Sequence, residues 1–235
     1  MFPEALVNGP LFGIGLTVIA YVLAELIVSR LEISLPPFVI AATAIIVFLL
    51  YTPSVSYEQY AIGADFINFL LGPATIAFAL PLYRNREIIK EKAQIIFLGI
   101  MVATITAIVS VYVCGKLVGA SDIILLSLVP KSITTPIAIE VTKTIGGLPA
   151  LTAPVVVFTG VLGATFNHKI LKMLGVKNDI AAGLAIGASS HGLGTSACIK
   201  HSLVQVALGG VAIALTGIAT SILAPILLPI LQSLL

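Results

Sequence analysis

The chain has 235 residues, of which 59% are hydrophobic and only 9% are charged, and its mean hydropathy is +1.16. Because soluble domains carry about 25% charged residues, this composition indicates an integral membrane protein. The net charge of +2 and the lack of a basic run with interleaved aromatic residues argue against nucleic acid as a partner. Two cysteines are too few for a disulfide framework or a metal cluster, and we expect Cys114 and Cys198 to be small buried residues.

Charged and turn-forming clusters divide the chain into apolar segments, most of them long enough to cross a bilayer core about 30 Å thick. The absence of a strict apolar–polar alternation favours helices over a transmembrane β-barrel. We therefore predict an all-α, polytopic membrane protein, whose first segment is retained because no signal-peptide pattern precedes it. The segments lie near 5–29, 35–52, 63–83, 93–118, 122–145, 149–167, 180–200 and 203–233.

The segments differ in how continuous they are. Those near 35–52, 93–118, 149–167 and 203–233 are strongly apolar and are expected to be complete spans. Glycine, proline and polar residues interrupt those near 63–83, 122–145 and 180–200. In a bilayer, such backbone is tolerated where protein buries it or where it lines a cavity. We expect these three segments to be broken helices or re-entrant hairpins.

The two halves of the chain show a similar order of segments. Leu35-Pro36 and Leu148-Pro149 each open an apolar run, and the two pairs lie 113 residues apart. We therefore expect a single transmembrane domain over 1–235 that contains two related repeats, about 5–119 and 121–235. Many secondary transporters have repeats inverted in the membrane and hold their substrate between broken helices, and we expect that arrangement here.

Basic residues gather in two loops. The first loop contains Arg84, Arg86, Lys90 and Lys92, and the second contains Lys169, Lys172 and Lys177. The positive-inside rule places both loops in the cytoplasm. Three apolar segments separate them, and three complete crossings would place the loops on opposite sides. One segment must therefore be re-entrant or cross twice, and 122–145, which contains Pro130 and Pro136, is the expected one.

The first polar stretch runs from Lys131 to Pro136 within that interrupted segment. Lys131 is either a counter-ion for an anionic substrate or a lysine whose ammonium extends to the membrane surface. Ser132, Thr134 and Thr135 precede Pro136, which is the pattern of a helix start. Such a start directs free N–H groups and a positive dipole end at an anion. The alternative is an ordinary proline kink.

The second polar stretch comprises Ser189, Ser190, His191, Gly192, Gly194, Thr195 and Ser196. Glycine allows the chain to unwind and to approach a ligand closely. His191 is expected either to bind substrate or carry a proton, or to form a structural hydrogen bond with a facing helix. Ser190 and His191 are adjacent, which does not suit a nucleophile–base pair. We therefore expect no enzyme activity and no cofactor. We also expect no metal site, because no ligand spacing links His168 and His201 with His191.

Further polar residues stand in other segments. Gly72-Pro-Ala-Thr75 is a milder interruption in the first half, and with Asn68 it is expected to form a cavity wall or a packing hinge. Glu25 and Glu140 lie within apolar segments, where pairing with a lysine would stabilise them. Glu140 and Lys143 are three residues apart, which is close enough for an ion pair on a helix.

Four motifs resemble the CidB/LrgB family of membrane proteins over essentially the whole chain. They run from Leu71 to Tyr83, from Pro130 to Ala138, from Gly146 to Thr152 and from Ser189 to Thr195. The resemblance implies a membrane protein associated with control of murein hydrolase activity and autolysis in bacteria, of the holin-like or antiholin-like kind. It also implies a carrier for small organic acids, because plastid relatives in the family are glycolate/glycerate translocators.

One departure from the family pattern concerns the anion site. The family continues after Gly-Thr with Ala-Arg, whereas Gly194-Thr195 is followed here by Ser196-Ala197. Lys200, about one turn later, is the candidate replacement for the missing arginine. Otherwise Lys131 carries more of the anion binding, or the substrate differs.

These observations give two hypotheses for function. The main one is a secondary carrier of small monocarboxylates in a bacterial plasma membrane, with an alternating-access or elevator movement coupled to protons or cations. The alternative is a holin-like or antiholin-like membrane protein that modulates autolysis. Expected partners are a small organic anion, the lipid bilayer, a second copy of the chain and a small holin-like membrane protein.

Overall fold

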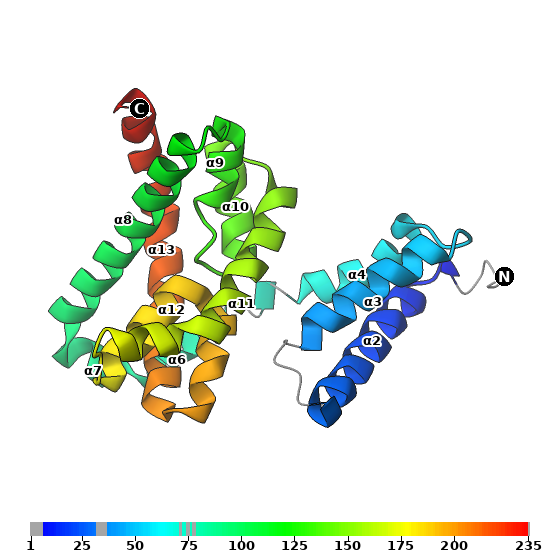
Figure 1. Cartoon of the computed structure of the whole chain (residues 1–235), viewed down its shortest axis with the longest axis horizontal. Coiled ribbons are helices and arrows are strands. Elements are labelled where there is room, and N and C mark those ends of the chain that lie inside the picture. The colour runs from blue at the N-terminus through cyan, green and yellow to red at the C-terminus, as the bar shows by residue number, and fades with distance from the viewer. Residues whose placement is uncertain (1–6, 32–36, 71, 74–75, 77–78, 235) are drawn as a thin grey trace. The chain divides into compact units, whose positions relative to one another are not determined.

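The computed structural model describes residues 7–31, 37–70, 72–73, 76 and 79–234. These residues form helices joined by short turns and contain no strand (Figure 1). The prediction of an all-α membrane protein is therefore confirmed. Four of the described helices are long and apolar enough to cross a membrane: Pro10–Leu31, Ala93–Leu117, Pro149–Met173 and Leu203–Leu234. The chain divides into two compact units, Met1–Ala74 and Thr75–Leu235.

The first unit contains α2 (Pro10–Leu31), α3 (Pro37–Tyr51) and α4 (Tyr57–Phe69). Helix α2 packs against both of the others. Its contact with α4 depends on two glycines, because a Cβ atom on Gly13 would lie 2.9 Å from the Cα of Gly63. A Cβ at either position would force the helices apart.

Helix α3 is shorter than expected. It has 15 residues, which gives a length of about 22 Å at 1.5 Å per residue. That length falls short of a bilayer core about 30 Å thick. The described part of the segment near 35–52 is therefore apolar, as expected, but its helix is too short to be the expected complete span.

The second unit begins with two short helices, α6 (Ala79–Arg84) and α7 (Arg86–Glu91), and continues into the long α8 (Ala93–Leu117). Ile88 and Ile89 of α7 pack against the same apolar cluster as Ile180, which follows the second basic loop. Both basic loops therefore lie at one end of this unit, as the positive-inside rule requires. We call it the basic end. In Figure 1, α8 runs away from this end toward α9.

The segment after α8 forms a re-entrant hairpin. Helix α9 (Asp122–Leu128) is followed by turns over residues 129–133, and α10 (Thr135–Ile145) runs back. The chain after α10 returns beside α9, because the backbone N–H of Leu148 donates to Ser127 Oγ at 2.7 Å and Thr152 Oγ1 donates to the Ser127 carbonyl at 2.9 Å. The chain thus doubles back beside α9, which fits the re-entrant segment that the charge count predicts.

The last three helices complete the second unit. Helix α11 (Pro149–Met173) returns to the basic end, and α12 (Asp179–Ser196) and the 3-10 helix η1 (Ala197–Lys200) lead into α13 (Leu203–Leu234). Helix α12 packs between α11 and α13 and also contacts α8. It is broken internally, so the segments near 122–145 and 180–200 contain the predicted breaks, whereas part of the segment near 63–83 lies outside the described residues. The duplication of the two halves stays a prediction.

Candidate functional site

Lys131 lies at the inner tip of the α9–α10 hairpin. Its side chain is half-buried, and the ammonium donates a hydrogen bond to Ser132 Oγ at 3.2 Å. Val129 and Ile133 on either side are each 1% exposed, and Ser132 is buried as well. A lysine in such apolar surroundings needs a counter-charge, water or hydroxyl groups to offset its desolvation. Ser132 supplies only one hydroxyl, so the ammonium retains free donors for a ligand.

Helix α10 starts where the sequence predicts. Thr134 is the N-cap residue with extended backbone angles (φ −65°, ψ 144°), and Pro136 lies in the first turn. The first helical hydrogen bond joins the Ala138 N–H to the Thr134 carbonyl at 2.9 Å. The N–H groups before Ala138 have no acceptor within the helix. Thr134 Oγ1 is also buried and lacks a hydrogen-bond partner among the described residues.

These groups are of the kind that bind an anion, and they lie within eight residues of one another. They are the positive end of the α10 dipole, its free N–H groups, the Thr134 hydroxyl and the Lys131 ammonium, all from residues 131–138. A carboxylate accepts hydrogen bonds only, and helix N-termini are common sites for it. Thr135 and Pro136 are half-buried beside the same turn.

Helix α12 is broken at Ser190 and His191. Ser190 has φ −140° and ψ 16°, and His191 has φ 44° and ψ −146°. A positive φ is unusual for a residue with a side chain and costs about 1–3 kcal/mol. It therefore persists only where the surrounding structure enforces it. The predicted break in the second polar stretch is therefore present, and it lies on the histidine rather than on the glycines.

A hydrogen bond to the facing helix holds His191. Its Nε2 lies 2.9 Å from the Val156 carbonyl of α11, and the side chain is 5% exposed. A carbonyl oxygen only accepts, so Nε2 must carry the proton in this bond. This arrangement matches the structural alternative for His191 and leaves Nδ1 as the nitrogen that can gain a proton.

Asn167 of α11 anchors the other side of the break. Its amide Nδ2 lies 2.9 Å from Ser190 Oγ and 3.4 Å from Ser189 Oγ, and the two hydroxyls are 3.0 Å apart. Sequence reasoning missed Asn167 because it stands at the end of an apolar segment beside His168. The signal that could have identified Asn167 is an amide side chain at the end of an apolar run, because buried amides need hydrogen-bond partners.

Glycines on the neighbouring helices make room for the break. A Cβ atom on Gly160 would lie 2.7 Å from His191 Cε1, and one on Gly163 would overlap Ser190 Oγ. On α13, a Cβ on Gly209 would lie 2.6 Å from the Cγ2 of Thr195. Thr195 Oγ1 is buried and has no hydrogen-bond partner among the described residues. The residues at and after the break therefore pack closely against glycine positions on both α11 and α13.

The remaining predicted residues have more varied positions. Gly192 has open space where a Cβ atom would lie, and Gly194 packs against Ser190. Ser196 is exposed and donates to the Leu193 carbonyl at 2.7 Å. Lys200 is exposed at the end of η1, and its role as a replacement for the missing arginine stays a prediction.

The first-half residues belong to the other unit. Asn68 is exposed on α4 and donates to Asp65 Oδ1 at 3.2 Å. Thr75 lies outside the described residues. The expected cavity wall or hinge around these two residues stays a prediction.

Both polar stretches lie next to helices that pack against α11. Helix α11 packs against both α10, which follows the first stretch, and α12, which contains the second. Val156, whose carbonyl accepts from His191, belongs to the same buried apolar cluster as Val129 and Ile133 of the hairpin. The two polar stretches are therefore connected through the packing of α11.

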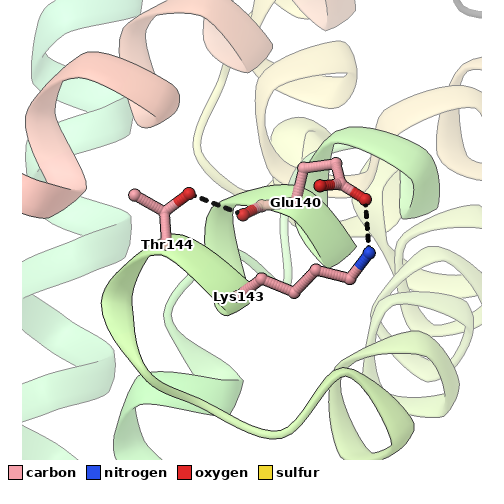
Figure 2. A network of polar contacts seen from close by, with 3 residues as sticks. All are labelled: Glu140, Lys143 and Thr144. Carbon is pink, nitrogen blue, oxygen red and sulfur yellow. Dashed lines mark hydrogen bonds and ion pairs between the residues drawn. The ribbon is translucent and has the colours of Figure 1, made fainter.

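The predicted pair on α10 is confirmed. Lys143 Nζ lies 2.7 Å from Glu140 Oε1, and the Thr144 hydroxyl donates to the Glu140 carbonyl at 2.9 Å (Figure 2). Both charged side chains are more than half exposed, so this pair stands apart from the buried tip. Glu25 is exposed on α2. Cys198 is buried as expected, whereas Cys114 is exposed on α8, contrary to expectation.

Comparison with known proteins gives the family. The model of the LrgB-like family matches residues 17–230, and the chain belongs to this family. It is 34% identical over 222 residues to "Antiholin-like protein LrgB" of Bacillus mycoides (strain KBAB4), covering 94% of this chain and 96% of that protein. It is 36% identical over 213 residues to "Uncharacterized protein YwbG" of Bacillus subtilis (strain 168), covering 91% and 95%. No solved structure matches the chain.

Proposed function

We propose that this chain is a secondary carrier of small monocarboxylates, of the glycolate, glycerate, lactate or pyruvate kind. The observation that carries the proposal is the start of α10 at the tip of a re-entrant hairpin, with Lys131 and the unpartnered Thr134 hydroxyl beside it. Carriers with broken helices hold anionic substrates at such half-helix N-termini.

Each group at the tip has a distinct role in this proposal. The Lys131 ammonium and the α10 dipole neutralise the carboxylate, which would otherwise be costly inside the membrane. Ser132, Thr134 and Thr135 bind carboxylate or hydroxyl oxygens of the substrate. The break in α12, held by Asn167 and Val156, fixes the bend of that helix. Coupling to protons would use His191 Nδ1.

Uptake into proteoliposomes tests the proposal. Purified protein should accumulate labelled glycolate, lactate or pyruvate in a saturable manner, and the unlabelled acids should compete. Exchange of a preloaded acid for the labelled one would detect a carrier even without a coupling ion. The absence of both uptake and exchange for all of these acids, with folded protein verified by its melting transition, would sink the proposal.

A second candidate function is antiholin-like modulation of murein hydrolase activity and autolysis. The name of the Bacillus mycoides relative favours it more directly than it favours transport. A role of this kind needs a pore or a protein partner rather than a substrate site. Leakage of a small dye from liposomes that is unchanged by Lys131→Ala and His191→Ala would support the second candidate over the first.

The assembly and location follow from either candidate. We propose a multi-pass protein of a bacterial plasma membrane, because four described helices are able to span a bilayer and the family has bacterial members. A second copy of the chain and a small holin-like membrane protein are the proposed protein partners. Cross-linking in membranes, followed by mass determination of the cross-linked species, separates these two partners.

A further inference from the structure

A pocket separate from both polar stretches opens at the basic end of the second unit. It has a volume of about 520 Å³ and lies where the end of α11, the loop before α12 and the start of α13 meet. Its basic lining residues are His168, Lys169, Lys172, Lys177 and His201, and its lining includes no acidic residue. The three lysines are exposed around the pocket. The three lysines carry positive charge, so they repel one another unless an anion is bound.

The inner wall of the pocket is held in place by hydrogen bonds. Gln205 is 8% exposed, and its Nε2 donates to Asp179 Oδ1 at 2.8 Å. Ser202 Oγ donates to the other oxygen of the same carboxylate at 2.7 Å. Both oxygens of Asp179 thus accept from neutral side chains, and no ion pair between Asp179 and a lysine is found among the described residues. The three lysines of the pocket therefore have no ion-pair partner among the described residues.

The two histidines are organised by the same network. Because the Gln205 amide donates to Asp179, its Oε1 accepts from His168 Nε2, and these atoms are 2.9 Å apart. His168 then stacks on His201 with ring centroids 3.7 Å apart and an angle of 18° between the planes. The exposed ring of His201 thereby lies at the pocket, where its N–H group can donate to an acceptor.

We propose that this pocket binds the phosphate group of an anionic ligand at the cytoplasmic side of the membrane. Lys169 and Lys172 stand in the last turns of a helix long enough to span the membrane, which is the level of lipid headgroups. Basic pockets between transmembrane helices on this side bind phosphate-bearing headgroups. Leu171, Val176 and Ala182 add apolar wall to the lining, which suits a ligand with a carbon skeleton.

Native mass spectrometry of the purified full chain in detergent tests this proposal. Phosphatidylglycerol, phosphatidylcholine and sn-glycerol 3-phosphate are titrated separately. Binding of phosphatidylglycerol but not of sn-glycerol 3-phosphate assigns the phosphate to a lipid headgroup, and binding of both assigns it to soluble and lipid-borne phosphates alike. Binding of phosphatidylglycerol no tighter than that of phosphatidylcholine, together with no binding of sn-glycerol 3-phosphate, would overturn the proposal.

A matched pair of variants locates the ligand. The double variant Lys169→Gln, Lys172→Gln should weaken binding at least about tenfold, since each basic residue near the membrane surface contributes several-fold to the affinity for anionic groups. Arg84→Gln, Lys90→Gln removes the same charge from the other basic loop and should leave binding within about twofold. Equal losses in both variants would show nonspecific attraction and contradict a site in this pocket. The melting temperatures of the lipid-free variants verify that both are folded.

Discussion

The two interruptions in the second unit are built differently. At the hairpin tip, the start of α10 leaves N–H groups, the Thr134 hydroxyl and the Lys131 ammonium with bonding capacity to spare. At the break in α12, Asn167 and the Val156 carbonyl bind the two serine hydroxyls and the imidazole, and the Thr195 hydroxyl, one turn later, is the group of this stretch without a partner among the described residues. The first is suited to an external ligand, and the second is suited to holding a strained backbone in place. Polar residues in a membrane segment thus indicate a site only when their hydrogen bonds remain unfilled.

The largest effect is expected at Lys131. Lys131→Ala should lower the affinity for a small carboxylate by about 100-fold or more, because removing one partner of a buried charge pair costs about 3–5 kcal/mol. Competition with a labelled acid in proteoliposomes measures the change. Lys143→Ala is the matched control on the same hairpin, since its exposed pair with Glu140 contributes at most about 1 kcal/mol to stability. If both substitutions lowered the affinity for the carboxylate by a similar factor, Lys131 would have no special role in anion binding.

The α12 break should respond to packing rather than to ligand. Gly163→Ala places a methyl group on the Ser190 hydroxyl and should destabilise the protein by about 1–3 kcal/mol, as overpacking does. Gly99→Ala on α8 meets nothing within 4 Å and should be neutral or stabilising by up to about 1 kcal/mol. Thermal unfolding in detergent compares the two. A Gly163→Ala protein as stable as the wild type would show that the break adapts freely.

Asn167 tests whether the break depends on its amide. Asn167→Leu should cost about 1–3 kcal/mol, because the buried Ser190 hydroxyl loses a donor. Asn68→Leu, at an exposed position on α4, should change stability by less than about 0.5 kcal/mol. Thermal unfolding measures both, and carboxylate competition at a temperature where both are folded shows whether the loss reaches the hairpin tip. An unchanged melting temperature for Asn167→Leu would mean that the hydroxyls hold each other without the amide.

The smallest effects are expected at two threonines, one of which should affect carboxylate binding and the other stability. Thr134→Val removes a hydroxyl that has no partner among the described residues, so it should barely change stability while weakening carboxylate binding about fivefold to tenfold. Thr142→Val removes a hydroxyl that lies 2.8 Å from Thr152 Oγ1, so it should lower stability by about 1 kcal/mol and leave binding unchanged. If Thr134→Val lowered stability without weakening carboxylate binding, Thr134 would have a structural role instead of a binding role.

Much of the fold follows from hydropathy and charge. Apolar length identifies α8, α11 and α13 as spans, because each backbone polar group in lipid must be satisfied within the helix. Pro130, Pro136 and the two basic loops together predict the re-entrant hairpin, since proline ends helices and lysine stays in the cytoplasm. Boundaries such as that of α3 follow less well, because apolar composition alone does not fix where a helix ends.

The site is harder to predict than the fold. The start of α10 at Thr134 was predictable from a local pattern. The bonds of His191 and Asn167 depend on the register between α11 and α12, and no local pattern sets that register. The same is true of Gly160 and Gly163, whose role appears only when the facing helix is placed.

Ligand protection of the hairpin tip tests the central claim most directly. In a Cys114→Ser, Cys198→Ala background, Thr135→Cys places a thiol in the first turn of α10, and Lys143→Cys places one at the exposed pair. Alkylation by a small maleimide is followed with and without a saturating carboxylate. The account predicts that the carboxylate slows alkylation at position 135 and leaves position 143 unchanged. Equal rates at position 135 with and without every acid tested would contradict an anion site at the tip.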